Sequence, residues 1–167
     1  MNCPYQNICG GCLMRAMEEN QYRQTKKDWF AKLVHAIKQP EIKQGTPVFV
    51  ADGARRRAEM AFIWQKGKLV LGFNTAESHD IADIQYCAAL TNEINEILPM
   101  VRNFLQEFCN IKVAQKIKKK VAQTAITDGE IRLTEADNGI DILLEIAGSL
   151  GLEHRMLISE FAQSCPK

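Results

Sequence analysis

The sequence predicts an α+β fold, in which an antiparallel sheet carries helices on one side. Two observations predict it: helical periodicity over 14–38 and 90–108, and short β-prone runs separated by glycine-containing turns. The 167 residues, 46% of them hydrophobic and 25% charged, suffice for a globular domain with a buried core. The formal net charge of +1 excludes a protein-wide basic field, so any nucleic-acid contact must use a local patch.

The N-terminal part divides into a loop and a helix. The first twelve residues are rich in cysteine, glycine and proline, which excludes a regular element there. Tyr22, Trp29 and Leu33 then begin an apolar stripe with steps of seven and four residues, and Ile37 extends it. This spacing predicts a long amphipathic helix over 14–38.

The middle of the chain predicts a hairpin followed by a second helix. β-prone runs occupy 48–50, 57–64 and 69–73, and Gly67 lies in the turn between the last two. The second amphipathic helix, over 90–108, has Thr91 as its expected N-cap.

The C-terminal part predicts more antiparallel structure. A lysine run, Asp128-Gly129 and Asp137-Asn138-Gly139 separate the next β-prone runs, which favours an antiparallel meander. Those runs cover 111–117, 121–127, 130–134 and 140–146, and a last helix is expected over 152–163.

The cysteine spacing near the N-terminus is the strongest chemical signal. Cys3, Cys9 and Cys12 lie within ten residues and are joined partly by glycines, so a short loop could wrap one inorganic centre. A four-iron cluster needs a fourth ligand. Cys87 is the best candidate, because the turn before the second helix can present it.

The spacing alone leaves the chemistry of this centre open. An iron–sulfur cluster, a zinc ion and unliganded or disulfide-bonded cysteines are all compatible with it, although only Cys9-x2-Cys12 has the form of a zinc knuckle.

No apolar signal core follows Met1, and no apolar run approaches the roughly 20 residues that span a bilayer. The sequence therefore predicts a cytoplasmic protein without membrane contact. Disulfides are disfavoured in that compartment. Cys109 and Cys165 are expected to be ordinary thiols.

Two basic stretches are candidates for contact with a polyanion. Arg55, Arg56 and Arg57 begin a strand, so the first and third should share one face and the second should take the other. A guanidinium group suits forked phosphate contacts and stacking on unpaired bases, but an edge strand guarded by charge is the plainer interpretation. The second stretch is either a solvated turn or a contact for a nucleic-acid backbone, and consists of Lys116, Lys118, Lys119 and Lys120.

Several of these motifs together resemble a known family. Cys3-Pro4-Tyr5 and Cys9-Gly10-Gly11-Cys12, followed by a long helix, resemble the iron–sulfur motif of the bacterial RNA 5-methyluridine methyltransferases. Residues 55–62 resemble the family's basic strand, and parts of 71–84 resemble the segment that leads to its fourth cysteine. The resemblance implies a [4Fe-4S] cluster held by Cys3, Cys9, Cys12 and Cys87, and it implies structured ribosomal or transfer RNA as partner, contacted by the arginine and lysine stretches.

The resemblance also bears on where the catalytic residues and the cofactor site should lie. The family's enzymes use S-adenosylmethionine, a nucleophilic cysteine and a general base to methylate C5 of uridine. Gly148-Ser149-Leu150-Gly151 lacks the spacing of a cofactor-binding turn, and the setting of Cys165 does not match the family's nucleophile. We therefore expect no catalytic residue and no S-adenosylmethionine site in this chain, and we expect it to be inactive alone.

On this interpretation the chain has four parts. Residues 1–12 form the iron–sulfur loop with Cys87, and 13–40 form a helix that would pack on the methyltransferase domain. Residues 41–151 form a central RNA-interacting domain, and 152–167 begin the connection to the methyltransferase domain, which would be supplied in cis or as a separate chain. The alternative is a stand-alone metal-binding protein, with iron–sulfur or zinc, that interacts with RNA or acts in redox chemistry.

Overall fold

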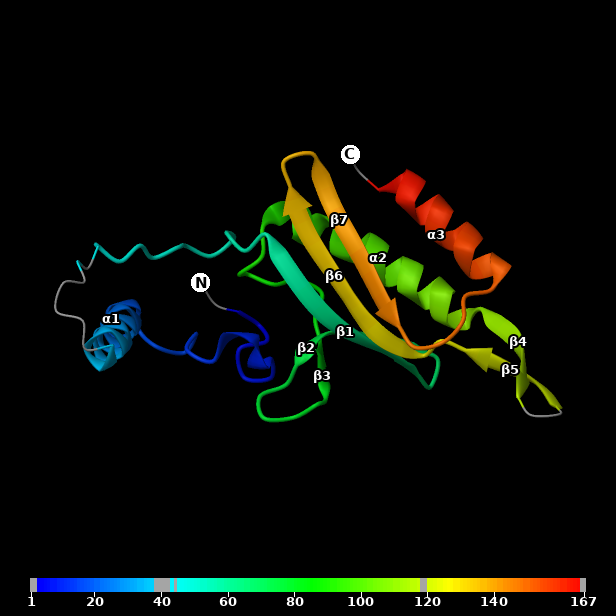
Figure 1. Cartoon of the computed structure of the whole chain (residues 1–167), viewed down its shortest axis with the longest axis horizontal. Helices are drawn as coiled ribbons and strands as arrows, with labels where there is room; N and C mark the ends of the chain where they lie inside the picture. Colours follow the sequence, from blue (N-terminus) through cyan, green and yellow to red (C-terminus); the bar gives the residue numbers. More distant parts are fainter. Residues whose placement is uncertain (1–2, 38–42, 44, 118–119, 166–167) are drawn as a thin grey trace.

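The computed structural model describes residues 3–37, 43, 45–117 and 120–165. It has an α+β fold, as the sequence predicts (Figure 1). In chain order the elements are η1 (Gly10–Cys12), α1 (Glu19–Ala36), β1 (Arg57–Gln65), β2 (Lys68–Asn74), β3 (Ile81–Asp83), α2 (Asn92–Asn110), β4 (Lys112–Ile117), β5 (Lys120–Ala125), β6 (Asp128–Ala136), β7 (Gly139–Ile146) and α3 (Leu152–Ser164).

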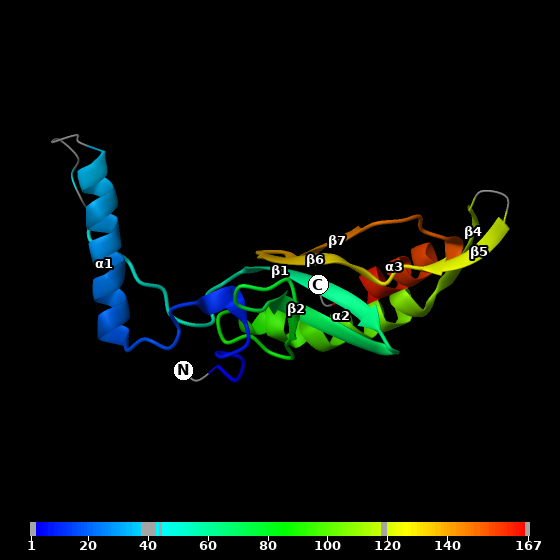
Figure 2. The ribbon, with the colours of Figure 1, turned by 90° about the horizontal axis from the view of Figure 1, so that it is seen from below.

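The main sheet has five antiparallel strands in the order β3-β2-β1-β6-β7. The predicted hairpin forms between β1 and β2, where Lys66 and Gly67 take positive φ angles of 52° and 74°. The turn at Asp137-Asn138-Gly139 is also confirmed, and it joins β6 to β7. Within the described residues β4 and β5 pair only with each other, as a two-stranded ribbon that extends beyond the sheet (Figure 2).

The predicted meander is wrong because β6 pairs with the distant β1 instead of β5. The expected turn at Asp128-Gly129 is wrong for the same reason, since Gly129 lies inside β6. A Cβ at this position would lie 2.5 Å from the carbonyl oxygen of Glu145 and 2.9 Å from the ring of Phe62. This glycine therefore allows close packing of β6 against β1 and β7.

The core lies between the sheet and α2. The inward residues of β1, among them Met60 and Phe62, are fully buried beneath the apolar face of α2, which includes Leu98 and Leu105. Fully burying such a side chain is worth about 1.5–3 kcal/mol. Thr91 is the N-cap residue of α2, as predicted, although its side chain makes no capping hydrogen bond.

Helix α3 lies on the same side of the sheet as α2 (Figure 2). The two helices meet through aromatic side chains: the rings of Phe104 and Phe161 stack with centroids 4.3 Å apart, and the His154 ring lies edge-on to Phe108 at 4.6 Å. Helices therefore cover one face of the sheet, as the sequence predicts. No helix in the described residues combines the length and the apolar character that crossing a bilayer requires.

The cysteine-rich loop, the first helix and two short segments differ from the prediction. The loop contains one regular element, the 3-10 helix η1 over Gly10–Cys12, although none was expected there. α1 begins at Glu19, because residues 13–17 form turns, and it projects away from the sheet (Figures 1 and 2). Residues 48–50 are extended but pair with no strand in the described part of the chain. β3 is too short for a sequence pattern to reveal, and it is held by an ion pair between Asp83 and Arg102 at 2.8 Å.

Candidate metal centre

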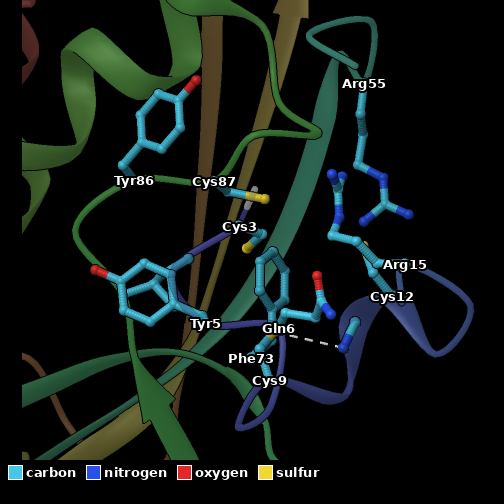
Figure 3. Close-up of a pocket in the computed structure, with 12 residues that line it drawn as sticks. Cys3, Tyr5, Gln6, Cys9, Cys12, Arg15, Arg55, Phe73, Tyr86 and Cys87 are labelled. Atoms are coloured by element: carbon cyan, nitrogen blue, oxygen red, sulfur yellow. Dashed lines mark hydrogen bonds between the residues drawn. The ribbon is translucent and has the colours of Figure 1, made fainter. Parts of the chain in front are cut away.

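The four predicted cysteine ligands line one hollow at the end of the sheet (Figure 3). Cys3, Cys9 and Cys12 come from the N-terminal segment, and Cys87 comes from the turn between β3 and α2. The same hollow is lined by three aromatic side chains and two arginines, namely Tyr5, Phe73, Tyr86, Arg15 and Arg55. The fold therefore brings together thiols that are far apart in the sequence.

The glycines of the Cys-Gly-Gly-Cys motif allow the loop to lie close to the sheet. A Cβ on Gly10 would lie 3.0 Å from the carbonyl oxygens of Asn74 and Thr75, so the loop rests directly on the end of β2. Gly11 donates its amide to the sulfur of Cys9 at 3.4 Å. Neither glycine takes a positive φ angle, so their role in the structure is to allow close approach of the backbone.

Asn95 holds the turn that presents Cys87. Its Oδ1 accepts the Cys87 amide at 2.9 Å, and its Nδ2 donates to the carbonyl oxygens of Cys87 at 3.1 Å and Thr91 at 3.0 Å. Burial raises the pKa of the Cys87 thiol, and hydrogen bonding by the backbone at Ala89 and Leu90 opposes that rise. The turn therefore offers backbone donors to a sulfur placed in a partly apolar setting.

Two further contacts fix the N-terminal segment to the sheet end. Arg15 donates a forked pair of hydrogen bonds to Asp52, at 2.8 and 2.7 Å. The pKa of Arg15 is raised mainly by Asp52 and further by a hydrogen bond to Cys12, while Arg15 lowers the pKa of Asp52. The hydroxyl of Tyr5 accepts the amide of Gln85 at 3.0 Å. Sequence patterns do not reveal these contacts, because each joins residues from separate segments.

The donor set can be compared with what a metal centre needs. Within the described ranges, no three His, Cys, Asp or Glu side chains converge closely enough to hold a metal ion. Four thiolates are the donor set of a [4Fe-4S] cluster and also of a structural zinc ion. The chemistry of the residues that line the hollow therefore fits either centre.

The two remaining cysteines lie away from the hollow. Cys109 is buried within α2, and burial raises the pKa of its thiol to about 11. Cys165 follows α3, and burial also raises the pKa of its thiol. Neither cysteine lines the hollow, and their role as ordinary thiols stays a prediction.

The three predicted arginines occupy different surroundings. Arg55 lines the cysteine hollow. Arg56 forms ion pairs with Glu135 at 3.3 Å and Asp137 at 3.0 Å, so its guanidinium is already bound by two carboxylates of the same chain. Arg57 begins β1 and is exposed. The triplet is therefore not one basic patch.

The face of the sheet opposite the helices is acidic. The strand register places Arg57 on this face beside Thr134, and the next pair along is Glu59 with Arg132, whose side chains are ion-paired at 2.9 Å. Carboxylates outnumber cations on the face, with Glu59, Asp128, Glu130, Asp141 and Glu145 against Arg57, Lys68 and Arg132. This excess of carboxylates makes the face as a whole less favourable for a phosphate backbone.

The lysine stretch lies at the other end of the molecule. Lys116 lies in β4 and Lys120 in β5, while Lys118 and Lys119 fall outside the described residues. The β4–β5 ribbon extends from the end of the sheet opposite the cysteine loop (Figure 2). The two predicted basic stretches are therefore separated by the length of the sheet.

No protein-family model matches the chain. Comparison with curated proteins nevertheless shows that the chain is related, over nearly all of its length, to RNA (uracil-C5) methyltransferases, and the family resemblance read from the sequence is confirmed to that extent.

Three relatives illustrate this. The chain is 31% identical over 165 residues to 23S rRNA (uracil(1939)-C(5))-methyltransferase RlmD of Histophilus somni, covering 96% of the chain and 34% of the relative. It is 29% identical over 165 residues to RlmD of an Enterobacter species, covering 97% and 34%. It is 30% identical over 162 residues to an uncharacterized RNA methyltransferase of Zymomonas mobilis, covering 96% and 37%. The chain thus spans about a third of the length of these relatives.

Proposed function

We propose that this chain is the iron–sulfur and RNA-binding part of an S-adenosylmethionine-dependent RNA (uracil-C5) methyltransferase. One observation carries the proposal: four cysteines from distant segments line one hollow, in a chain related to RNA methyltransferases over nearly its whole length. The relatives named for 23S rRNA make ribosomal RNA the first substrate to test.

Cys3, Cys9, Cys12 and Cys87 would hold the [4Fe-4S] cluster. When bound, such a cluster supplies a covalent cross-link between its ligands and a centre that can exchange one electron. The chain's own residues prepare the site: Asn95 shapes the turn of Cys87, and Arg15 ties the segment after Cys12 to Asp52. The cluster would thereby fix the N-terminal segment to the end of the sheet.

In this proposal the chain binds and orients RNA, and another domain performs the chemistry. Methylation at C5 needs a uridine extruded from its stack, a nucleophile for C6 and bound S-adenosylmethionine. The RNA contacts assigned to this chain are Arg55 at the cysteine hollow and the lysines of the β4–β5 ribbon. The methyltransferase domain, in cis or as a separate chain, would pack on the exposed stripe of α1.

Anaerobic purification followed by visible absorption, iron and acid-labile sulfide analysis tests the metal centre. We expect four irons and four sulfides per chain, and a brown colour. Replacing Cys87 with Ser should lower cluster content and destabilise the fold, whereas the matched control Cys109→Ser should keep full cluster content. One zinc ion per chain, or a full cluster in Cys87→Ser, would contradict the proposal.

A further inference from the structure

Tyr86 is an aromatic side chain at the cysteine hollow whose contacts do not indicate a structural role. Tyr86 directly precedes Cys87 and keeps 46% of its surface exposed, and its hydroxyl makes no hydrogen bond within the described residues. Tyr5 lines the same hollow but differs, because its hydroxyl accepts the Gln85 amide and its ring packs against the core. Tyr86 therefore presents a free aromatic ring beside the metal centre.

Arg55, in the segment before β1, is hydrogen-bonded to the residues that follow Cys87. Its amide donates to the carbonyl oxygen of Ala89 at 2.9 Å, and its own carbonyl accepts the amide of Thr91 at 3.2 Å. Its backbone is therefore fixed to the segment that follows Cys87. Figure 3 shows Arg55 and Tyr86 on opposite sides of Cys87.

The charge of Arg55 is available to a ligand. Of the arginines that line the hollow, Arg15 is held by Asp52, whereas no carboxylate of the described residues pairs with Arg55. Arg56, its neighbour in sequence, is also paired, with Glu135 and Asp137. An exposed ring and an uncommitted guanidinium thus flank one opening.

We propose that this rim, defined by Tyr86 and Arg55, binds an unpaired nucleotide of RNA. The base would stack on Tyr86 and the guanidinium of Arg55 would contact the adjoining phosphate. Stacking platforms of this kind accept any base, because every base has a π-face, but they require the base to be unpaired. The rim would therefore select single-stranded or looped RNA over a duplex and bring it against the cysteine centre. This inference rests on the RNA-binding function proposed above.

The alternative surface for RNA is disfavoured by charge. Arg57 lies on the acidic face of the sheet, where Glu59 and Arg132 already form an ion pair. A phosphate placed there would meet more carboxylates than cations. Arg57 is therefore the matched control for Arg55, since it is also an exposed arginine and lies only two residues further along, at the first position of β1.

The test uses the full chain, purified anaerobically, with two RNA probes: a hairpin with an unpaired uridine-rich loop, and a fully paired duplex of the same length. Binding is measured by fluorescence anisotropy over a range of salt concentrations, with cluster absorbance recorded for every sample. We expect Tyr86→Leu to weaken binding of the hairpin about tenfold while binding of the duplex stays unchanged, the scale that loss of one stacked base predicts. Tyr86→Phe should bind like the unchanged chain.

The arginine arm of the test uses the same probes. Arg55→Gln should weaken hairpin binding and reduce the salt slope by about one phosphate contact, and Arg57→Gln should change neither quantity. Hairpin binding that is insensitive to Tyr86→Leu would overturn the proposal that the rim binds an unpaired nucleotide. A loss of binding that only parallels a loss of cluster absorbance would overturn it as well. Failure of the unchanged chain to bind either probe would overturn the proposed RNA-binding function as well.

Discussion

At the scale of single residues, the cysteine centre depends on side chains that carry no obvious chemical signal. The thiols themselves are visible in the sequence, because their types and spacing are restrictive. Asn95 is not visible, since an asparagine one turn into a helix is common. Its four hydrogen bonds, to the amide of Cys87 and to the carbonyl oxygens of Cys87, Leu90 and Thr91, are made possible only by the turn that the fold creates.

Replacing Asn95 with Ala should loosen this turn. The change removes the acceptor of the Cys87 amide, whereas the carbonyl oxygens of Cys87 and Thr91 keep the backbone amides of Leu90 and Asn95. A donor left unsatisfied away from water costs about 1–3 kcal/mol. We expect a lower midpoint in thermal unfolding and faster loss of cluster absorbance in air. Asn92→Ala is the control, because Asn92 is exposed in the first turn of the same helix. Equal cluster lifetimes in the two variants would contradict a positioning role for Asn95.

Gly129 gives a second test at this scale. A methyl group there would meet the Glu145 carbonyl oxygen at 2.5 Å and the ring of Phe62 at 2.9 Å. Gly129→Ala should therefore cost about 1–3 kcal/mol in the free energy of unfolding, measured by urea titration. Gly45→Ala meets no atom within 4 Å and should be close to neutral. A Gly129→Ala chain as stable as the control would mean that the β1–β6–β7 packing is looser than described.

At the scale of elements, patterns within one segment were predictable and partners between segments were not. The periodicity of α2 and the runs of β1, β2 and β7 agree with the observed elements within a few residues. The pairing of β1 with β6 was missed, because a β-prone run does not reveal its neighbour. The turn after Gln65 was predicted correctly, because its glycine takes a positive φ angle. Gly129 allows close strand packing instead, so the rule that an Asp-Gly pair marks a turn gave a wrong prediction there.

Helix α1 is the element whose apolar face is least covered. Tyr22 meets Phe49 edge-on at 6.2 Å between ring centroids, so the returning segment covers part of the helix. Further along, Trp29 is 51% exposed and Leu33 66% exposed. The stripe is therefore partly exposed within the described residues, and the domain expected to pack on it stays a prediction.

Exposure of this stripe should make the chain associate with itself. We expect the weight-average mass in analytical ultracentrifugation to rise with protein concentration, because contiguous apolar patches mark interaction surfaces. Leu33→Lys should reduce the rise, and Lys32→Gln, an exposed change on the same helix, should not. A strictly monomeric chain at all concentrations would contradict this prediction.

At the scale of the whole molecule, the fold places its two proposed RNA-contacting regions at opposite ends. The cysteine hollow lies at one end of the sheet and the β4–β5 ribbon at the other, with α2 and α3 covering the face between them. The sequence predicted both regions from residue type. It could not predict their separation, nor that Arg56 would be paired and Arg57 would lie on an acidic face, since these depend on strand order.

The stability of the whole domain should depend on pH through His154. This residue lies on α3 and is fully buried, with its ring against Phe108 of α2. Its Nδ1 accepts the Gly151 amide at 3.3 Å, and its Nε2 has no hydrogen-bond partner in the described residues. Burial lowers the pKa of His154 below the ordinary value of 6.5. In the unfolded chain the imidazole returns to about 6.5 and takes up a proton more readily.

The sign of the effect follows from this difference. Above about pH 6.5 the imidazole is neutral in both states and the free energy of unfolding is unaffected. As the pH falls below that value, the unfolded chain binds the proton first, so stability declines by up to about 1.4 kcal/mol per pH unit until the folded pKa is reached. Urea titrations at pH 7.5 and 5.5 should therefore show a loss of stability that His154→Gln reduces. His35→Gln, an exposed change on α1, should leave the loss intact, and an unchanged loss in His154→Gln would assign the acid sensitivity to other groups.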